Sequence, residues 1–339
     1  MRTIDWNNES NTVIMVDQTL LPNEYKIIEC KTLGSLCEAI KSLRVRGAPA
    51  LGAAGGFGMA LAATLSSANT MDALIKDLEV AAKTIKATRP TAVNLAWGVN
   101  RVMHAVSDAY DVDGIRDVTI AESMHIADED VAINKKLGEN GAKLLDDGDT
   151  VMTHCNAGRM ACVDWGTALG VIRSAVAAGK QINVIACETR PLNQGSRITT
   201  WELMQDNIPV KLITDSMSGH VMRKGMVDKV IVGADRITED VVFNKIGTYT
   251  HSIIAREHDV PFYVAAPVST FDFEGWEDSV EIELRDADEL RFFGKEQIAP
   301  LDVEVYNPAF DATPMEYISA IITERGVFEP PFMIDEVKM

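Results

Sequence analysis

The fold is decided by the stretch from Asp149 to Gly179, which reads DTVMTHCNAGRMACVDWGTALGVIRSAVAAG. It opens with the apolar run Thr150-Val151-Met152, which is typical of a buried strand. The small residues Cys155-Asn156-Ala157-Gly158 then break the pattern, and apolar residues of helical period follow as far as Val176. A strand, a short turn and a helix present a functional group at the carboxyl end of a strand in an α/β sheet. Here the presented group is the Cys155 thiol.

Four more apolar runs after this stretch predict further strands. Helical patterns separate them, and such alternation is typical of a parallel sheet with helices on both faces. The five predicted strands are Val151–Thr153, Ile182–Ala186, Val210–Ile213, Val230–Val232 and Phe262–Ala265. We also predict a final helix over Met315–Arg325, which the following Pro330-Pro331 would stop.

The chain before this region predicts a different, mostly helical domain. Two short runs, Thr12–Val16 and Tyr25–Ile28, are typical of strands. Apolar residues then recur at every third or fourth position from Leu33 to about Gly98, as they do in helices. Two further helices are predicted over 102–109 and 117–145. We therefore predict a mostly helical N-terminal domain with short strands over residues 1–125.

The chain is strongly acidic, since 50 acidic and 32 basic residues among 339 give a net charge of -18. Such a field repels nucleic acid and anionic membranes, so we predict neither as a partner. A small anionic substrate would need locally gathered Arg and Lys side chains. The uncharged segment from Gly47 to Met71 imitates a membrane span, but it is rich in Gly and Ala and contains Pro49. We therefore expect a closely packed, buried helix there.

Cysteine and histidine usage predicts neither disulfides nor metals. The five cysteines are Cys30, Cys37, Cys155, Cys162 and Cys187. Their number is odd and no pair has CxxC spacing, which predicts reduced thiols in a cytoplasmic protein. The histidines show no HExxH or paired metal spacing, so no metal site is predicted. Neither a GxGxxG nor a Walker A sequence is present, and no cofactor is predicted.

Reactive side chains follow the predicted strands at the points where they end. The residues that follow the five strands are, in order, Cys155, Glu188-Thr189-Arg190, Asp215, Asp235 and Pro267. All but Pro267 contribute to a set of one thiol, three carboxylates and one arginine. Ligands of open α/β sheets bind at the carboxyl ends of strands, so we expect these groups to converge on one pocket. A single Asp after a strand more often caps a helix, and a single buried Cys is usually inert packing, so the joint pattern carries the prediction. His154 is not predicted to be the base for Cys155, because adjacent strand side chains point to opposite faces.

Basic residues precede three predicted helices. These segments are Arg46-Gly47-Ala48-Pro49, Thr88-Arg89-Pro90-Thr91, and Asn244-Lys245-Ile246-Gly247 before the helix Thr248–Glu257. A helix N-terminus with a cation beside it is a ready phosphate site. Each segment alone could instead be an ordinary surface salt-bridge partner. Three of them in an acidic protein indicate a phosphorylated small molecule.

Several blocks of sequence resemble the methylthioribose-1-phosphate isomerases. The blocks are RGAPALG, THCNAG, GTALGVIR, ETRPLNQGSRITTWEL, LITDSMSGH, VIVGADRI, NKIGTY, PFYVAAP and NPAFDATP. The wider group includes ribose-1,5-bisphosphate isomerases and regulatory subunits of the translation-initiation guanine-exchange factor. The resemblance runs from about Met1 to Pro330, and the ETRPLNQG block is specific. It implies a Rossmann-like catalytic domain over 126–339 after the helical domain, and a homodimer.

The resemblance also implies roles for individual residues. The family's catalytic Cys falls on Cys155 and its catalytic Asp on Asp235. Its sugar-phosphate contacts fall on Arg46, Gly47, Ala48, Arg89, Gln194, Asn244 and Lys245. Of these, Gln194 rests on the resemblance alone. The implied reaction, in methionine salvage, converts a cyclic aldose 1-phosphate to an open ketose 1-phosphate, either by a proton relay or by a direct hydride shift.

One departure from the family pattern leaves the sugar's 5-substituent open. Arg159-Met160-Ala161-Cys162 follows CNAG, where the family more often has small or apolar residues. Arg159 would suit a 5-phosphate if it faced the pocket, whereas Met160 and Trp165 would suit a methylthio group. A 5-deoxy sugar would need only a small apolar wall. A non-catalytic regulatory protein is a further alternative, although such a protein would not need both Cys155 and Asp235.

Overall fold

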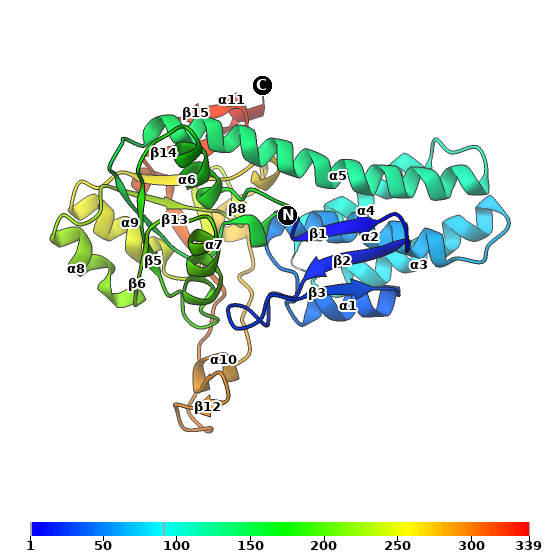
Figure 1. Cartoon of the computed structure of the whole chain (residues 1–339), viewed down its shortest axis with the longest axis horizontal. Helices are drawn as coiled ribbons and strands as arrows, with labels where there is room; N and C mark the ends of the chain where they lie inside the picture. Colours follow the sequence, from blue (N-terminus) through cyan, green and yellow to red (C-terminus); the bar gives the residue numbers. More distant parts are fainter. Residues whose placement is uncertain (1, 91, 339) are drawn as a thin grey trace. The chain divides into compact units, whose positions relative to one another are not determined.

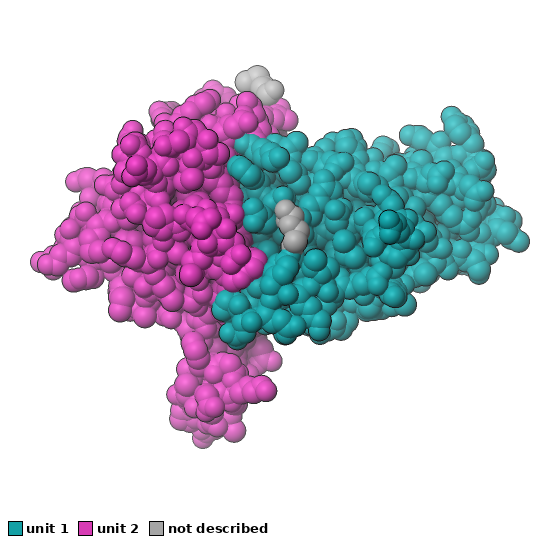
Figure 2. Space-filling view, viewed as in Figure 1, with its two compact units in different colours: residues 1–135, 157–166 teal, residues 136–156, 167–339 magenta. Residues whose placement is uncertain are grey.

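The structure is a computed structural model that describes residues 2–90 and 92–338. Thr91, at the end of one predicted phosphate segment, lies outside the described residues. The chain forms two compact units, coloured separately in Figure 2. Unit 1 comprises Met1–Lys135 and Ala157–Gly166, and unit 2 comprises Lys136–Asn156 and Thr167–Met339. The chain therefore leaves unit 2 directly after Asn156 and returns to it at Thr167.

Unit 1 combines a small antiparallel sheet with helices (Figure 1). The sheet has the order β1-β2-β3, with strands β1 (Ile4–Asn7), β2 (Thr12–Val16) and β3 (Ile27–Cys30). The helices are α1 (Leu33–Lys41), α2 (Ala48–Leu65), α3 (Met71–Lys86), α4 (Val93–Val106) and most of α5 (Val112–Gly141), whose residues from Lys136 onward belong to unit 2. The domain boundary predicted after residue 125 falls inside α5, and division into separately folding domains stays a prediction.

The helix α2 forms the centre of unit 1. It is long and apolar enough to cross a membrane by length and composition, yet 72% of that window is buried inside the structure. Its glycines allow close helix packing, because a Cβ at Gly98 of α4 would lie 2.0 Å from the carbonyl oxygen of Gly52 in α2. The predicted buried, closely packed helix is therefore confirmed.

Unit 2 is built on a seven-stranded sheet with the order β15-β14-β10-β7-β4-β5-β6. The strands are β4 (Thr150–Thr153), β5 (Asn183–Cys187), β6 (Val210–Ile213), β7 (Lys229–Val232), β10 (Phe262–Ala265), β14 (Ala320–Thr323) and β15 (Gly326–Phe328). Only β15 runs antiparallel to its neighbour. All five predicted strands are confirmed, and so is a Rossmann-like parallel sheet.

The strand order reverses beside β4. The chain runs from β4 outward through β5 and β6, and then returns to the other side of β4 with β7. Ligands of doubly wound sheets bind at such a topological switch point, at the carboxyl ends of the strands. Cys155 follows β4 and Asp235 follows β7, so both residues lie beyond the carboxyl ends of the two strands that flank the switch point.

A second, three-stranded sheet of unit 2 has the order β13-β9-β8 and carries further predicted site residues. Its strands are β8 (Arg236–Ile237), β9 (Val241–Lys245) and β13 (Phe310–Pro314). The helices of unit 2 are α6 (Ala168–Ala177), α7 (Thr200–Gln205), α8 (Ser218–Arg223), α9 (Thr248–Glu257), α10 (Asp288–Arg291) and α11 (Ile334–Lys338). A short hairpin, β11 (Phe292–Phe293) with β12 (Glu296–Gln297), follows α10.

The predicted helix over Met315–Arg325 is wrong. Only Met315–Tyr317 forms a single 3₁₀ turn, and the chain then enters β14. All four residues of β14 are buried, with Ile321 and Ile322 in the middle of the strand. Branched side chains of this kind favour a strand, and a short apolar run does not distinguish a buried strand from a buried helix segment by periodicity alone.

We predict that Gly98→Ala destabilises the protein. The added methyl group would meet the backbone of Gly52, which cannot move without shifting α2, so the free energy of unfolding should fall by about 1–3 kcal/mol. The matched control is Gly219→Ala in α8, where the nearest atoms would lie 3.7 Å from the new Cβ. Urea unfolding should show the control as neutral or slightly stabilised. Equal effects of the two changes would contradict this account of the helix contact.

Candidate active site

The backbone of Cys155 is held in an unusual conformation. Its φ angle is 66°, in the left-handed region that residues other than glycine seldom occupy. The amide N–H of Cys155 donates to the hydroxyl of Thr189 at 2.8 Å, and its carbonyl accepts from the hydroxyl of Thr199 at 2.7 Å. Both partners come from the region that follows β5. Strain of this kind persists only where neighbouring groups enforce it, and it clusters at functional sites.

The next residue anchors this turn to the interior of unit 2. The Asn156 amide donates to Glu202 at 2.9 Å and to Thr199 at 3.2 Å. Glu202 is fully buried and forms an ion pair with the guanidinium of Arg173 at 2.8 Å. Because each buried charge and amide in this network has a partner, removing one of them would leave another group unsatisfied. The network therefore fixes the position from which the Cys155 thiol projects.

The loop after β5 meets the loop after β6, as the strand-end argument predicted. The two carboxylate oxygens of Asp215 accept hydrogen bonds from the N–H groups of Thr189 and Arg190, both at 2.8 Å. Thr189 in turn contacts Cys155. Asp235 is the last residue of the loop between β7 and β8, and its N–H donates to the carbonyl of Phe243 at 2.9 Å. The structure thus brings Cys155, Thr189 and Asp215 into one hydrogen-bonded group.

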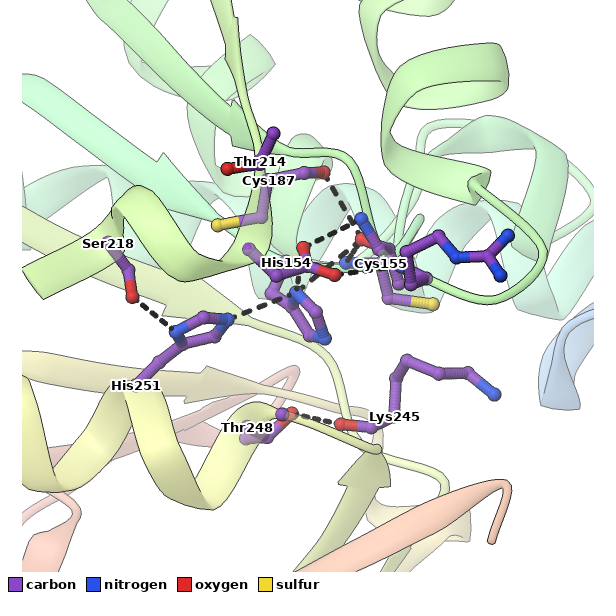
Figure 3. Close-up of polar contacts among 12 residues, drawn as sticks. His154, Cys155, Cys187, Thr214, Ser218, Lys245, Thr248 and His251 are labelled. Atoms are coloured by element: carbon purple, nitrogen blue, oxygen red, sulfur yellow. Dashed lines mark hydrogen bonds and ion pairs between the residues drawn. The ribbon is translucent and has the colours of Figure 1, made fainter. Parts of the chain in front are cut away.

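His154 is engaged with groups other than the neighbouring thiol. It is fully buried, and its Nε2 donates to the carbonyl of Ile246 at 2.9 Å. Its Nδ1 lies 3.3 Å from Nε2 of His251. Burial lowers the pKa of His154 to about 4, so the ring is neutral at pH 7. Figure 3 shows the Cys155 thiol pointing away from this ring, in agreement with the predicted alternation.

The end of β9 carries a buried cation. Lys245 is 7% exposed, and its ammonium donates to the carbonyl of Ala309 at 2.9 Å and lies over the ring of Phe310. Among the side chains that the structure describes, no carboxylate forms an ion pair with it within 4.0 Å. Figure 3 shows Lys245 extending toward the same side as the Cys155 thiol. The charge of Lys245 also acts on the carboxylate of Asp311, where burial raises the pKa and the charge of Lys245 opposes that rise. Because no carboxylate pairs directly with the buried ammonium, an anionic ligand would still stabilise this arrangement.

The adjacent residue Asn244 and the more distant Gln194 are also buried. The Asn244 amide donates to the hydroxyl of Thr248 at 3.0 Å, at the start of α9. Gln194 is 5% exposed, and its Oε1 has no hydrogen-bond partner among the described residues. Buried acceptors are normally satisfied, so Oε1 of Gln194 is suited to accept a hydrogen bond from a ligand hydroxyl.

The N-terminus of α9 is not open to a phosphate, and this part of the prediction is wrong. The carboxylate of Asp311 accepts hydrogen bonds from the N–H groups of Gly247 at 2.7 Å and Tyr249 at 3.2 Å. It therefore already caps the positive end of the helix. Burial raises the pKa of Asp311 to about 6, against these hydrogen bonds, which lower it. The side chains of Asn244 and Lys245, rather than the helix end, remain as candidate phosphate contacts.

In unit 1, the predicted segment Arg46-Gly47-Ala48 lies at the start of α2. Gly47 is the residue before the helix, has a φ angle of 94°, and provides no side-chain cap for the first N–H groups. A Cβ at Gly47 would lie 2.3 Å from the carbonyl oxygen of Ala161, so only glycine permits this close approach. Arg89 follows α3 and is partly buried. The start of α2 thus keeps the features of a phosphate site that the sequence predicted.

Arg159 is paired within unit 1. Its Nε donates to the carboxylate of Asp164 at 2.7 Å, and both side chains are 20% exposed. Its carbonyl accepts from the hydroxyl of Thr3 at 2.8 Å. Met160 is buried, and its carbonyl accepts from the Gln18 amide. The charge of Arg159 is therefore already offset by a carboxylate, which weakens the case for a second phosphate at this position.

The sequence pattern of the Initiation factor 2 subunit family matches residues 44–330. The chain belongs to this family. A Methanosarcina acetivorans relative, whose name provisionally assigns methylthioribose-1-phosphate isomerase activity, is 72% identical over 337 residues, covering 99% of this chain and 97% of that one. A Moorella thermoacetica relative named 5-deoxyribose 1-phosphate isomerase is 49% identical over 333 residues, covering 97% of this chain and 94% of that one.

Solved structures of the family have the same fold. 5-Methylthioribose 1-phosphate isomerase from Pyrococcus horikoshii has a TM-score of 0.94 and 43% identity, covering 99% of this chain and 95% of that one. A structure from A. fulgidus described as translation initiation factor eIF-2B, subunit delta, has a TM-score of 0.92 and 56% identity, with complete coverage of both chains. The family's names therefore include both enzymes and initiation factors.

Several residues that organise the site were not singled out by the sequence. Thr199 and Glu202 lie within the specific ETRPLNQG block and its continuation, but nothing in their local pattern indicates contact with the Cys155 turn. Asp311 lies in the NPAFDATP block, far along the chain from the helix that it caps. Hydrogen-bond partners from distant segments have no spacing signal in the sequence.

We predict that Asp311 makes folding stability depend on pH. The pKa of Asp311 in the folded protein lies above the ordinary value of about 3.9. Its protonated form therefore stabilises the folded state. This stabilisation is fully present below the ordinary pKa and is lost as pH rises through 6. Urea unfolding measures the free energy of unfolding of wild type and of Asp311→Asn. The difference between the two should change by about 2 kcal/mol between pH 4.5 and pH 7.5, because only wild type loses stability as the pH rises. The exposed Asp302→Asn serves as the control. A constant difference across this range would contradict the raised pKa.

Proposed function

We propose that this chain is an aldose-ketose isomerase that converts 5-methylthioribose 1-phosphate to 5-methylthioribulose 1-phosphate in methionine salvage. Two features together support the proposal. The strained Cys155 turn lies at the switch point of the sheet, and the buried Lys245 ammonium has no ion-pair partner among the described residues. Full-length similarity to relatives named for this activity supports it. The proposed reaction moves hydrogen within the sugar without net oxidation or reduction, so it balances without a cofactor.

In the proposed mechanism, Asp235 and Cys155 work as two proton carriers. Protonated Asp235 gives its proton to the ring oxygen as the C1–O bond breaks, and the Cys155 thiolate removes the proton from C2, forming a C1=C2 double bond. The Asp235 carboxylate then takes the proton from the C2 hydroxyl, and the Cys155 thiol returns its proton to C1. Both residues end in their starting states. Each proton transfer of this kind typically contributes about 10²- to 10⁴-fold to rate.

We further propose the substrate contacts. In unit 2, Lys245 and Asn244 would bind phosphate oxygens, and the Oε1 of Gln194 would accept a hydrogen bond from a sugar hydroxyl. In unit 1, we assign Arg46, Gly47, Ala48 and Arg89 to sugar-phosphate binding, because Gly47 leaves the first N–H groups of α2 without a side-chain cap.

The second candidate substrate is 5-deoxyribose 1-phosphate, which the name of the Moorella thermoacetica relative favours. Ribose 1,5-bisphosphate is disfavoured by the ion pair between Arg159 and Asp164. A non-catalytic regulatory role, suggested by the A. fulgidus structure's description, would leave the Cys155 and Asp235 pair without a purpose. We also propose a cytoplasmic homodimer. The odd number of cysteines supports the location, and the resemblance to the isomerases supports the dimer.

The first test compares substrates. Purified protein receives methylthioribose 1-phosphate, 5-deoxyribose 1-phosphate or ribose 1,5-bisphosphate in D₂O, and NMR follows the ketose product. We expect a preference of at least about tenfold in kcat/KM for the first, equivalent to about 1.4 kcal/mol, together with solvent deuterium at C1. A preference for another sugar would reassign the substrate. Complete retention of the substrate C2 hydrogen would establish a hydride shift, and no turnover of any sugar would favour the regulatory role.

The second test separates catalysis from binding. Cys155→Ser should lower kcat by about 10²-fold or more, because serine is a far weaker proton carrier at neutral pH. Its affinity for the substrate, measured by calorimetry, should stay close to that of wild type. Cys37→Ser, in α1 of unit 1, is the matched thiol control and should retain activity. Full activity in Cys155→Ser would overturn the proposed mechanism.

A further inference from the structure

Four side chains from separate parts of unit 2 lie close together next to the Cys155 turn. They are His154 after β4, Cys187 at the end of β5, Asp215 after β6, and His251 in α9. Their potential ligand atoms all lie within 4.8 Å of one another. Both histidines and Cys187 are buried, whereas Asp215 is partly exposed and so leaves a side from which an ion could enter. We call these four residues the His-Cys-Asp cluster.

The hydrogen bonds of His154 direct a lone pair into this cluster. The carbonyl of Ile246 can only accept, so Nε2 of the neutral His154 ring must carry the proton. The Nδ1 atom, which lies 3.3 Å from Nε2 of His251 and 3.8 Å from Oδ1 of Asp215, is therefore unprotonated. A histidine that binds a metal usually donates its other N–H to a backbone carbonyl in this way.

His251 has an equivalent partner on its outer side. Its Nδ1 lies 3.0 Å from the hydroxyl of Ser218, which can accept a hydrogen bond from that nitrogen (Figure 3). With the proton on Nδ1, the Nε2 lone pair of His251 faces Nδ1 of His154. With the proton on Nε2, the same two rings form an ordinary hydrogen bond and Ser218 becomes the donor. The two arrangements differ only in the position of one proton on His251 and in the direction of the Ser218 hydroxyl.

The spacing of the cluster suits a tetrahedral ion. Bonds of about 2.0–2.3 Å to nitrogen, oxygen and sulfur place tetrahedral ligand atoms roughly 3.3–3.8 Å apart. The two measured separations at His154 Nδ1, 3.3 Å and 3.8 Å, already lie in this range. The remaining separations, at most 4.8 Å, require side-chain movements of about 1 Å.

We propose that the His-Cys-Asp cluster binds a divalent transition metal ion of the zinc class. Imidazole, thiolate and carboxylate are the ligands that zinc takes in proteins, and four protein ligands are typical of a structural site. As the sulfur–metal bond forms, the thiol proton of Cys187 passes to solvent. The thiolate and the Asp215 carboxylate then neutralise the dication, so the buried site carries no net charge.

The contacts around the cluster give such an ion a role in positioning Cys155. Each oxygen of Asp215 accepts one backbone N–H and keeps a further lone pair for a metal. The hydroxyl of Thr189 lies 3.4 Å from Nδ1 of His154 and also accepts the N–H of Cys155. A bound ion would therefore clamp the ends of β4 and β5 to α9 and fix the loop that holds the thiol. This inference does not depend on the proposed reaction.

The test uses cobalt(II), which reports both geometry and ligand type. The full chain is treated with a chelator, desalted and titrated with cobalt(II) alone. We expect about one ion per chain, intense visible absorption of a tetrahedral centre, and a near-ultraviolet band from thiolate to cobalt. Zinc should displace the cobalt and should raise the Tm of the wild-type protein by about 5 °C when present at roughly 100 times its Kd.

Paired variants assign the ligands. Cys187→Ser should abolish the thiolate band, and His251→Gln should abolish or strongly weaken cobalt binding. Cys155→Ser and His258→Gln, which change a thiol and an imidazole outside the cluster, should retain both bands. Wild-type protein that gives no thiolate–cobalt band would overturn the proposal without any variant. Retention of the band in Cys187→Ser would likewise overturn it, because another thiolate would then be the sulfur ligand.

Discussion

The turn at Cys155 depends on two hydrogen bonds with threonine hydroxyls. Thr189 accepts the N–H of Cys155 and Thr199 donates to its carbonyl, so the left-handed backbone is fixed from both sides. A residue in this conformation would relax if either partner were absent. The thiol therefore projects from the end of β4 in a direction set by the region that follows β5, and the role we propose for it as a proton carrier requires such precise placement.

Local charge allows so acidic a chain to offer a site for the proposed anionic substrate. The net charge of -18 is a property of the whole chain, whereas a ligand experiences the local field. Lys245 is buried with a carbonyl and an aromatic ring as partners, while Asp311 neutralises the start of the adjacent helix α9. In the proposed site, phosphate would therefore be bound by side chains rather than by that helix end. Arg159, by contrast, is balanced by Asp164.

Close backbone packing provides the rigid frame of unit 1. Gly98 and Gly52 bring α4 and α2 into backbone contact, and Gly47 brings the start of α2 against Ala161. These contacts fit only residues without a Cβ. These contacts explain why the apolar helix α2 is rich in small residues. The same composition had already distinguished this segment from a membrane span. The same packing holds the start of α2, where N–H groups lack a side-chain cap.

Local sequence was enough to predict the five central strands of the large sheet and the residues that follow them. Apolar periodicity is a local property, and it located β4, β5, β6, β7 and β10 correctly and placed Cys155 after the first of them. It failed over Met315–Arg325, because a short apolar run does not specify which neighbour will bury it. The tertiary structure alone decided that Asp311 caps α9, that Thr189 and Thr199 hold Cys155, and that His154 faces His251, 97 positions away. Such partners are brought together by chain folding over long distances, and no spacing within the sequence encodes them.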